Sequence, residues 1–198
     1  MRVKRLIVCF NLINKIVLGF VIAVWSVVGI ADTSSSTFNF TAIFVGGSCE
    51  ISAPTSIQFN DGETLRPSEI EQGIAATTQS FNLILSKCSG WGLTPSVKVN
   101  GQKTSDFGPA LFRNTLGAMD SNGYGILLAT DGNTSFVSNP NLAATGTILA
   151  KNWNPESQLD SIDIRIPIVA KLTCGNCDYA GRQSGAFKAT VTFDFVYE

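Results

Sequence analysis

The sequence predicts an all-β fold, a sandwich of two sheets, and three observations lead to this prediction. From Asp32 onward the chain consists of short apolar or alternating runs that turn-forming residues separate. No helical periodicity is sustained for more than about two turns. In the last fourteen residues six apolar side chains stand at strict every-second-residue spacing. The chain has 198 residues, of which 44% are hydrophobic, so we expect one folded domain with one substantial core.

We expect eight strands, each rich in residues that favour the pleated conformation and bounded by turn formers. They cover residues 37–50, 56–59, 79–88, 96–100, 124–129, 145–149, 163–172 and 186–197. The turns between them include Asn60-Asp61-Gly62, Asn100-Gly101, Asp131-Gly132 and Asn139-Pro140. The one helical pattern is a single turn at residues 67–72.

The closing run, residues 185–198, is the clearest of these strands. A period of two places six apolar side chains on one face, namely Phe187, Ala189, Val191, Phe193, Phe195 and Tyr197. Lys188, Thr190, Thr192 and Asp194 lie on the other face. An exposed apolar edge strand is an aggregation hazard that proteins blunt with charge, proline or a bulge. From residue 189 to residue 197 only Asp194 does so, and no later run of the sequence covers this strand.

The first expected strand repeats the pattern, with Phe38, Phe40, Ala42 and Phe44 at every second position shortly before Cys49. Both ends of the folded part therefore predict apolar, one-faced strands. The simplest interpretation is that each strand is covered within its own chain.

Residues 1–31 have the composition of a secretory signal. A basic start leads into an almost uninterrupted apolar run at residues 16–28, and the small residues Gly29 and Ala31 suit a signal peptidase. We expect the mature chain to begin near Asp32.

Two alternatives for this leader stay open. Cleavage after Ala23 would also suit the apolar run. A retained membrane anchor is the other alternative, although Asn11, Asn14 and Lys15 interrupt the apolar stretch at residues 6–30.

Loss of the leader changes the charge balance. It removes four of the 14 basic residues and none of the 15 acidic ones, which leaves ten against fifteen and a net charge of −5. A mildly acidic chain without a basic cluster is a poor partner for nucleic acid or an anionic membrane.

Cysteine usage agrees with export, because Cys9 leaves with the signal and an even set of four cysteines remains. We favour Cys49 with Cys88 and Cys174 with Cys177. In the chain-entropy model the first pair stabilises the fold by about 4 kcal/mol and the second by about 2 kcal/mol. The sequence alone does not exclude the two cross-paired connectivities.

Enzyme chemistry finds little support, since the sequence has no histidine and therefore lacks the commonest general base and metal ligand. Asp160 and Asp163 are the nearest paired carboxylates, and we interpret them as loop charges. Cys174-Gly-Asn-Cys177 could be a redox dithiol or half of a zinc site. Its position in a Gly- and Asn-rich link favours a structural loop staple. We expect no cofactor and no metal.

Trp91, Trp153 and Tyr124 could stack on a sugar, although packing is the simpler interpretation. The triplets that begin at Asn39 and Asn133 match the glycosylation pattern, but such triplets arise by chance.

The mature chain resembles subunits of the chaperone–usher pili of Gram-negative bacteria along essentially its whole length. The family's closing signature is similar to Gly185, fourteenth from the end, the alternating residues after it, and the penultimate Tyr197. Its first-strand cysteine and a partner about forty residues on match Cys49 and Cys88. The runs at residues 78–85 (TQSFNLIL), 123–131 (GYGILLATD) and 166–172 (IPIVAKL) also look like family strands.

The resemblance implies an incomplete immunoglobulin-like sandwich that lacks its seventh strand and is completed by a donated strand. A periplasmic pilus chaperone would lend the strand first, and at the outer-membrane usher the amino-terminal extension of a neighbouring pilus subunit would replace it. The protein would then be exported through the periplasm to the cell-surface fimbrium, as a structural subunit that contributes to cell adhesion. A glycan-recognising tip subunit is the alternative.

The same resemblance assigns roles along the chain. Residues 1–31 are the signal, 32–44 the donor strand and 45–198 the pilin domain. The inserted face would be Phe38, Phe40, Ala42 and Phe44, and the acceptor groove and the surface recognised by chaperone and usher would be Gly185, Phe187, Ala189, Val191, Phe193, Phe195 and Tyr197. Ala42 stands where family donor segments commonly have glycine, which leaves the preferred neighbour open.

Overall fold

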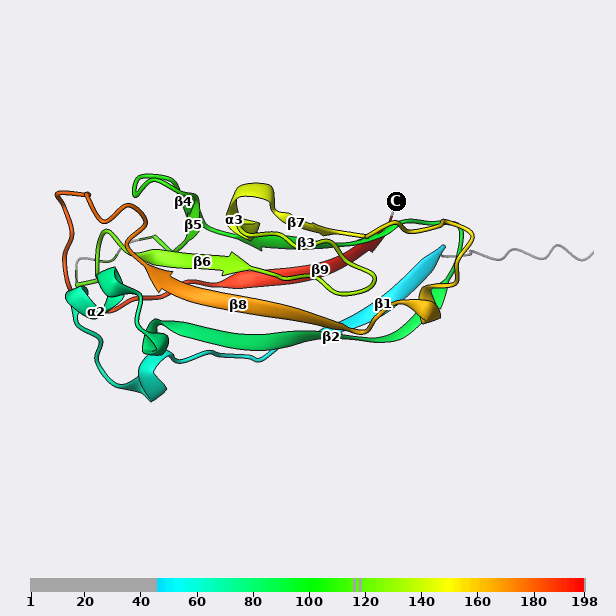
Figure 1. The fold of residues 1–198 in the computed structure, drawn as a ribbon, viewed down its shortest axis with the longest axis horizontal. Coiled ribbons are helices and arrows are strands. Elements are labelled where there is room, and N and C mark those ends of the chain that lie inside the picture. Colours follow the sequence, from blue (N-terminus) through cyan, green and yellow to red (C-terminus); the bar gives the residue numbers. More distant parts are fainter. Residues whose placement is uncertain (1–45, 116, 118, 198) are drawn as a thin grey trace, which may run out of the picture. The chain divides into compact units, whose positions relative to one another are not determined.

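The structure is a computed structural model, and it describes residues 46–115, 117 and 119–197. In these residues nine strands form two antiparallel sheets (Figure 1). The larger sheet has the order β1-β2-β8-β6-β5-β4, and the smaller has the order β7-β3-β9. The strands are β1 Gly47–Ser52, β2 Thr78–Gly90, β3 Pro95–Gly101, β4 Lys103–Thr104, β5 Leu111–Phe112, β6 Gly125–Ala129, β7 Thr147–Leu149, β8 Arg165–Thr173 and β9 Val191–Tyr197. The predicted all-β sandwich is confirmed.

The core lies between the sheets and is built from alternate residues of the long strands. Its fully buried side chains include Leu83 and Leu85 of β2, Val97 and Val99 of β3, and Ile166 and Ile168 of β8. Because side chains alternate between the two faces of a strand, each of these sets points toward the opposite sheet. Burial contributes about 1.5–3 kcal/mol for each such side chain.

The predicted single helical turn is present as α2, Pro67–Gln72. Pro67 occupies the first turn, where its missing N–H costs nothing, and the Arg66 N–H donates to the Glu69 carboxylate at 2.6 Å. Gly73 ends the helix at a φ of 63°. Ile70 is the buried residue of this helix.

A second short helix, α3 Leu142–Thr145, was not predicted. Asn141 caps it by accepting from the Ala144 N–H at 3.1 Å, and Gly146 closes it at a φ of 73°. Thr145, expected to begin a strand, therefore ends a helix, and β7 begins at Thr147. Three 3₁₀ turns complete the helical elements of the described residues: η1 Phe59–Gly62, η2 Ala75–Thr77 and η3 Leu159–Ser161.

Two further local predictions were wrong. Residues 56–59 form no strand, because η1 begins at Phe59 and the chain turns sharply through Asn60 and Asp61, whose φ values are 50° and 51°. Asn100-Gly101 is not a turn, since Gly101 continues β3 and pairs with Val191. A Cβ at Gly101 would lie 2.7 Å from the Thr190 carbonyl oxygen, so glycine serves here for close approach.

Both favoured disulfides are present in the structure. Cys49–Cys88 joins β1 to β2, and Cys174–Cys177 closes the loop that follows β8. The leader, residues 1–31, and the expected donor residues Phe38, Phe40, Ala42 and Phe44 lie outside the described residues. Within the described part, no helix is long and apolar enough to cross a bilayer.

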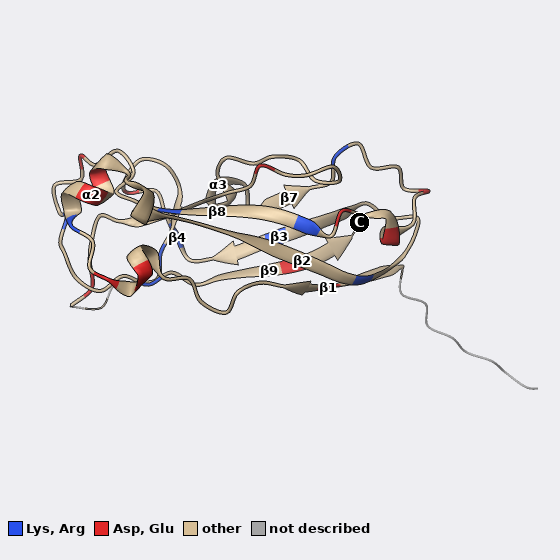
Figure 2. Ribbon diagram, turned by 60° about the horizontal axis from the view of Figure 1, so that its bottom comes forward, with Lys and Arg blue, Asp and Glu red and all other residues tan. Residues whose placement is uncertain are grey.

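Charged residues of the described part lie mostly on loops and strand ends and gather into no continuous basic stripe (Figure 2). Lys87 of β2 pairs with Glu50 of β1 at 2.8 Å, and this pair is largely exposed. Such exposed pairs contribute little to stability.

Candidate functional site

A groove of about 830 Å³ opens between two segments of chain, residues 53–58 after β1 and residues 184–193, which lead into β9. Its floor is the inner face of the larger sheet. The floor side chains are Phe81, Tyr124, Ile126, Leu128, Ala170 and Leu172. Pro67 and Ile70 of α2 also line it. The floor is therefore mainly apolar, whereas the rest of the lining also includes polar residues such as Gln58, Glu63 and Lys188.

Five of the seven expected acceptor residues line this groove: Gly185, Phe187, Ala189, Val191 and Phe193. Phe195 and Tyr197 do not, and they lie farther along β9, opposite Val97 and Pro95 of β3. The structure thus brings together the first five residues of the predicted set and leaves the last two outside the groove.

These side chains face the core but are covered from one side only. Phe187, Val191 and Phe193 pack against the core cluster and are half-buried, whereas the core residues of β8 beneath them are buried. Phe193 meets Phe81 edge to face at 6.3 Å between ring centroids. An apolar face that is packed below and open above is suited to burying a further apolar segment.

The backbone of β9 is also open on one side. β9 pairs with β3, and no strand among the described residues pairs with its other edge. The Val99 N–H donates to Gly146 at 2.8 Å, on the side of β3 away from β9. Val99 and its partner Phe193 therefore form a pair without mutual hydrogen bonds. By alternation, the N–H and C=O groups of Val191, Phe193 and Phe195 point to the free edge.

A strand was predicted from residue 186, but β9 begins only at Val191. The residues before Val191 are held by separate hydrogen bonds to individual residues and not by a neighbouring strand. The Ser121 N–H donates to the Ala186 carbonyl at 2.7 Å, and the Asn114 N–H donates to the Lys188 carbonyl at 3.0 Å. The Thr190 N–H donates to Asn114 Oδ1 at 2.9 Å. Even-numbered residues thus bond inward as they do in β9. The odd-numbered side chains from Phe187 to Phe193 line the groove and pack against the core, and the exposed residues Lys188 and Thr190 also border it.

Gly185 has a physical role at the start of this segment. A Cβ there would lie 2.5 Å from the Met119 carbonyl oxygen and 2.7 Å from the Ser121 nitrogen. Only glycine lets the chain pass this close to the 119–121 backbone before it forms the groove wall. The sequence pointed to Gly185 by resemblance, and the structure supplies the steric reason.

Sequence reasoning missed Arg113, which is 8% exposed and lies behind the groove wall. Its guanidinium donates to the carbonyl oxygens of Tyr124, at 2.8 Å, and Ser121. It lies 5.8 Å from the ring centroid of Phe107 and 5.9 Å from that of Phe187. Burial lowers the pKa of Arg113, and the Asp120 carboxylate partly opposes this shift. The sequence signal that could have indicated this residue is a single arginine directly after the apolar pair Leu111-Phe112.

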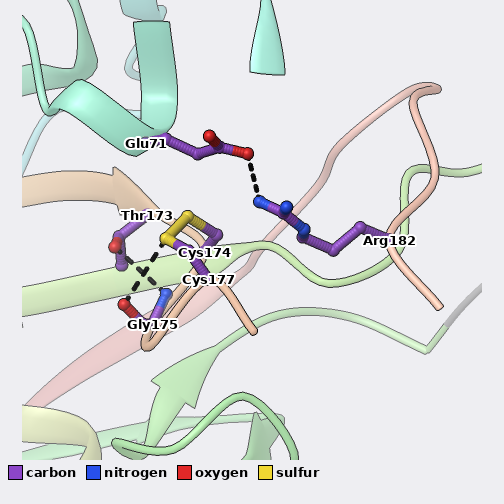
Figure 3. Close-up of polar contacts among 6 residues, drawn as sticks. All are labelled: Glu71, Thr173, Cys174, Gly175, Cys177 and Arg182. Carbon is purple, nitrogen blue, oxygen red and sulfur yellow. Dashed lines mark hydrogen bonds and ion pairs between the residues drawn. A yellow bond between two sulfur atoms is a disulfide. The ribbon is translucent and has the colours of Figure 1, made fainter. Parts of the chain in front are cut away.

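The loop closed by Cys174–Cys177 packs against the same region. The Asn176 N–H donates to the Phe107 carbonyl at 2.8 Å, and the Phe107 ring meets that of Tyr179 at 5.0 Å. Arg182, in the segment that follows this loop, pairs with Glu71 of α2 (Figure 3). Cys174 is fully buried at the end of a strand, a setting that suits a structural staple.

The other candidates of the sequence take part in packing or loop contacts. Tyr124 is buried in the groove floor, and Trp153 is half-buried with its indole N–H donating to the Leu93 carbonyl at 2.9 Å. Trp91 is 65% exposed.

Of the paired carboxylates, Asp163 accepts from the Arg165 N–H and Asp160 is exposed on η3. The Asn133 amide donates to the Asp163 and Arg165 carbonyls. Among the described residues no group of three or more potential ligands is placed to hold a metal.

Comparison with solved structures finds a likeness to the crystal structure of the P pilus rod subunit PapA. The match covers 83% of this chain and 100% of that chain, at 19% identity and a TM-score of 0.42. No protein-family model matches the chain, and no curated protein matches it either.

Proposed function

We propose that this chain is a structural subunit of a chaperone–usher fimbria, and that it polymerises by accepting a strand from a neighbouring copy in the groove beside residues 185–193. The observation that carries the proposal is the coincidence of an apolar groove with a free backbone edge along the same segment. A strand laid along that edge would hydrogen-bond to the odd-numbered residues and bury their side chains.

The donor is the segment of residues 32–44 in a second copy. Its alternating side chains Phe38, Phe40, Ala42 and Phe44 match the apolar lining in chemistry and in period. Burying three or four large side chains at about 1.5–3 kcal/mol each, together with ladder hydrogen bonds at about 0.5–1.5 kcal/mol each, gives a gross term above roughly 10 kcal/mol before association costs. A stable fibre needs a term of this size.

The remaining steps follow from the family resemblance. A periplasmic chaperone would hold the groove before assembly, an outer-membrane usher would exchange it for the donor strand, and the assembled subunits would form a surface fimbrium that contributes to adhesion. This role is structural, and it requires no cofactor, metal or nucleic acid.

The test compares two substitutions in adjacent residues of β9. Val191 lines the groove, whereas Thr192 is exposed on the outer face. Val191→Arg should abolish polymers in the same way as deletion of residues 32–44, because a charge in the groove would lose its hydration. Thr192→Arg is the matched control and should assemble normally.

Electron microscopy and sedimentation of exported protein provide the measurement. Circular dichroism of each variant establishes that it is folded. Polymers of normal length from folded Val191→Arg protein would refute the groove as the acceptor, and normal polymers from the deletion variant would refute residues 32–44 as the donor.

A further inference from the structure

Arg113 lies behind the groove wall and carries a charge into the interior. Leu111 and Phe112, just before it, are fully buried, and Arg113 itself is 8% exposed. An arginine is costly here because its cation loses most of its hydration. Its Nε atom is buried without a hydrogen-bond partner among the described residues. The guanidinium is therefore buried at a cost that its own hydrogen bonds only partly offset.

The two hydrogen bonds of Arg113 fix the plane of its guanidinium. Both terminal nitrogens donate to carbonyl oxygens of the turn before β6, those of Ser121 and Tyr124. A planar guanidinium whose two terminal nitrogens are both hydrogen-bonded has little freedom to rotate. The guanidinium is thus a fixed surface inside the protein.

Two aromatic rings pack against this surface, at nearly equal distances. Phe107 lies 5.8 Å away and Phe187 lies 5.9 Å away, both within the range of a cation–π contact. Phe107 is itself 3% exposed and is tied to the disulfide loop through Asn176. Phe187 is different, because it is half-buried and lines the groove. Arg113 therefore connects a buried part of the interior to a side chain of the groove wall.

We propose that Arg113 is a positioning residue that holds the ring of Phe187 and thereby sets which side chain of an inserted strand the groove accepts at its Gly185 end. The inference rests on the proposed function, since it takes the groove to be the site of strand insertion. It adds a residue outside the groove that determines specificity at one end.

A purely structural role makes a different prediction. If Arg113 only anchors the turn at residues 121–124, its loss weakens the binding of every inserted strand to a similar degree. If it positions Phe187, its loss affects the one donor side chain that packs against that ring and leaves the other end unchanged. A double-mutant cycle separates the two roles.

The experiment uses the mature chain with Phe38→Ser, Phe40→Ser and Phe44→Ser, so that its own donor segment cannot fill a groove; we refer to it as the donor-blocked chain. A fluorescent peptide of residues 32–44 is the probe, with two variants that carry Phe38→Ala or Phe44→Ala at opposite ends of the inserted face. Dissociation rates are measured with Arg113, Arg113→Met and Arg113→Lys.

Arg113→Met should speed dissociation of the native peptide about tenfold, and Arg113→Lys should have an intermediate effect because it keeps the charge but loses the fork. The Arg113→Met effect should disappear for one of the two alanine peptides and persist for the other. An equal effect on all three peptides, or no effect, would overturn the inference.

If Arg113→Met does not fold, Phe107→Leu is the alternative variant. It keeps the hydrogen bonds from Arg113 to the Ser121 and Tyr124 carbonyl oxygens and removes one of the two rings that pack against the guanidinium. It should produce a smaller effect at the same peptide end, and no effect there would also overturn the inference. Circular dichroism first establishes that the donor-blocked chain with native Arg113 is folded. Failure of this folded chain to bind any peptide would refute the proposed function itself, whereas the outcomes above concern Arg113 alone.

Discussion

Strands β8 and β9 have the same alternating pattern but different surroundings. The inward residues of β8 are buried, with Ile166 and Ile168 at 0% exposure, whereas the inward residues Val191 and Phe193 of β9 remain half-buried. β8 lies between β2 and β6, and β9 has β3 on one edge alone among the described strands. The comparison teaches that alternation specifies which face of a strand is apolar, while neighbouring strands decide whether that face is covered.

The same difference applies to the backbone. Both edges of β8 are used in ladders, but the odd-numbered residues of β9 direct their polar groups to a free edge. An open apolar face and an unpaired edge on one strand are both relieved by a single added strand.

Truncation of the two inward faces should have unequal costs. In the donor-blocked chain, Ile168→Ala should lower the free energy of unfolding by about 2–5 kcal/mol, because it leaves a cavity in a closed core. Phe193→Ala should cost only about 1–2 kcal/mol, because its ring is already partly exposed. Urea denaturation measures both.

Addition of the peptide of residues 32–44 sharpens this test. A bound strand completes the cover over Phe193, so the cost of Phe193→Ala should rise toward that of Ile168→Ala, while the latter stays constant. Equal costs without peptide would contradict the contrast between the two strands.

One disulfide supports the sheet that contains β8, and the other closes a loop that leads toward β9. Cys49–Cys88 ties β1 to β2, which pairs with β8, and its replacement by alanines should cost about 4 kcal/mol. Cys174–Cys177 closes a short loop between β8 and β9, and its replacement should cost about 2 kcal/mol.

The second replacement should also speed peptide dissociation, because the loop supports Phe107 behind the groove wall. Denaturation and peptide release measure the two effects. A larger loss of stability from the Cys174–Cys177 replacement would be inconsistent with this account.

Gly185→Ala should lower stability by about 1–3 kcal/mol, because the added methyl group would meet the backbone at Met119 and Ser121. The displaced segment forms the groove wall, so peptide affinity should fall as well. Gln183→Ala, at an exposed position outside the groove lining, is the control and should change neither quantity. An unchanged melting temperature in Gly185→Ala would show that the wall tolerates a wider spacing.

The sequence predicted much of the fold because the long strands have clear periods. The alternation around Leu83, Ile166 and Phe193 was sufficient to place β2, β8 and β9. β4 and β5 have two residues each, too few to display a period, and α3 depends on the cap at Asn141, which a propensity scan does not weigh.

The candidate site was predictable along one wall only. The period of residues 187–193 placed the odd-numbered side chains on one face, but the floor comes from strands whose sequences resemble ordinary core strands. Arg113 was not predictable, because its role depends on Phe107 and Phe187 meeting it from distant parts of the chain. Contacts of such long range leave no local pattern.

Amide hydrogen exchange along β9 shows whether its free edge accepts a strand. In the donor-blocked chain, the amides of Thr192 and Asp194 should be protected by β3, and those of Val191 and Phe193 should exchange rapidly at the free edge. The peptide of residues 32–44 should then protect Val191 and Phe193 and leave Thr192 and Asp194 as they were. Val191 and Phe193 amides that are already slow without peptide, or that stay fast with it, would contradict the account of β9 as the acceptor edge.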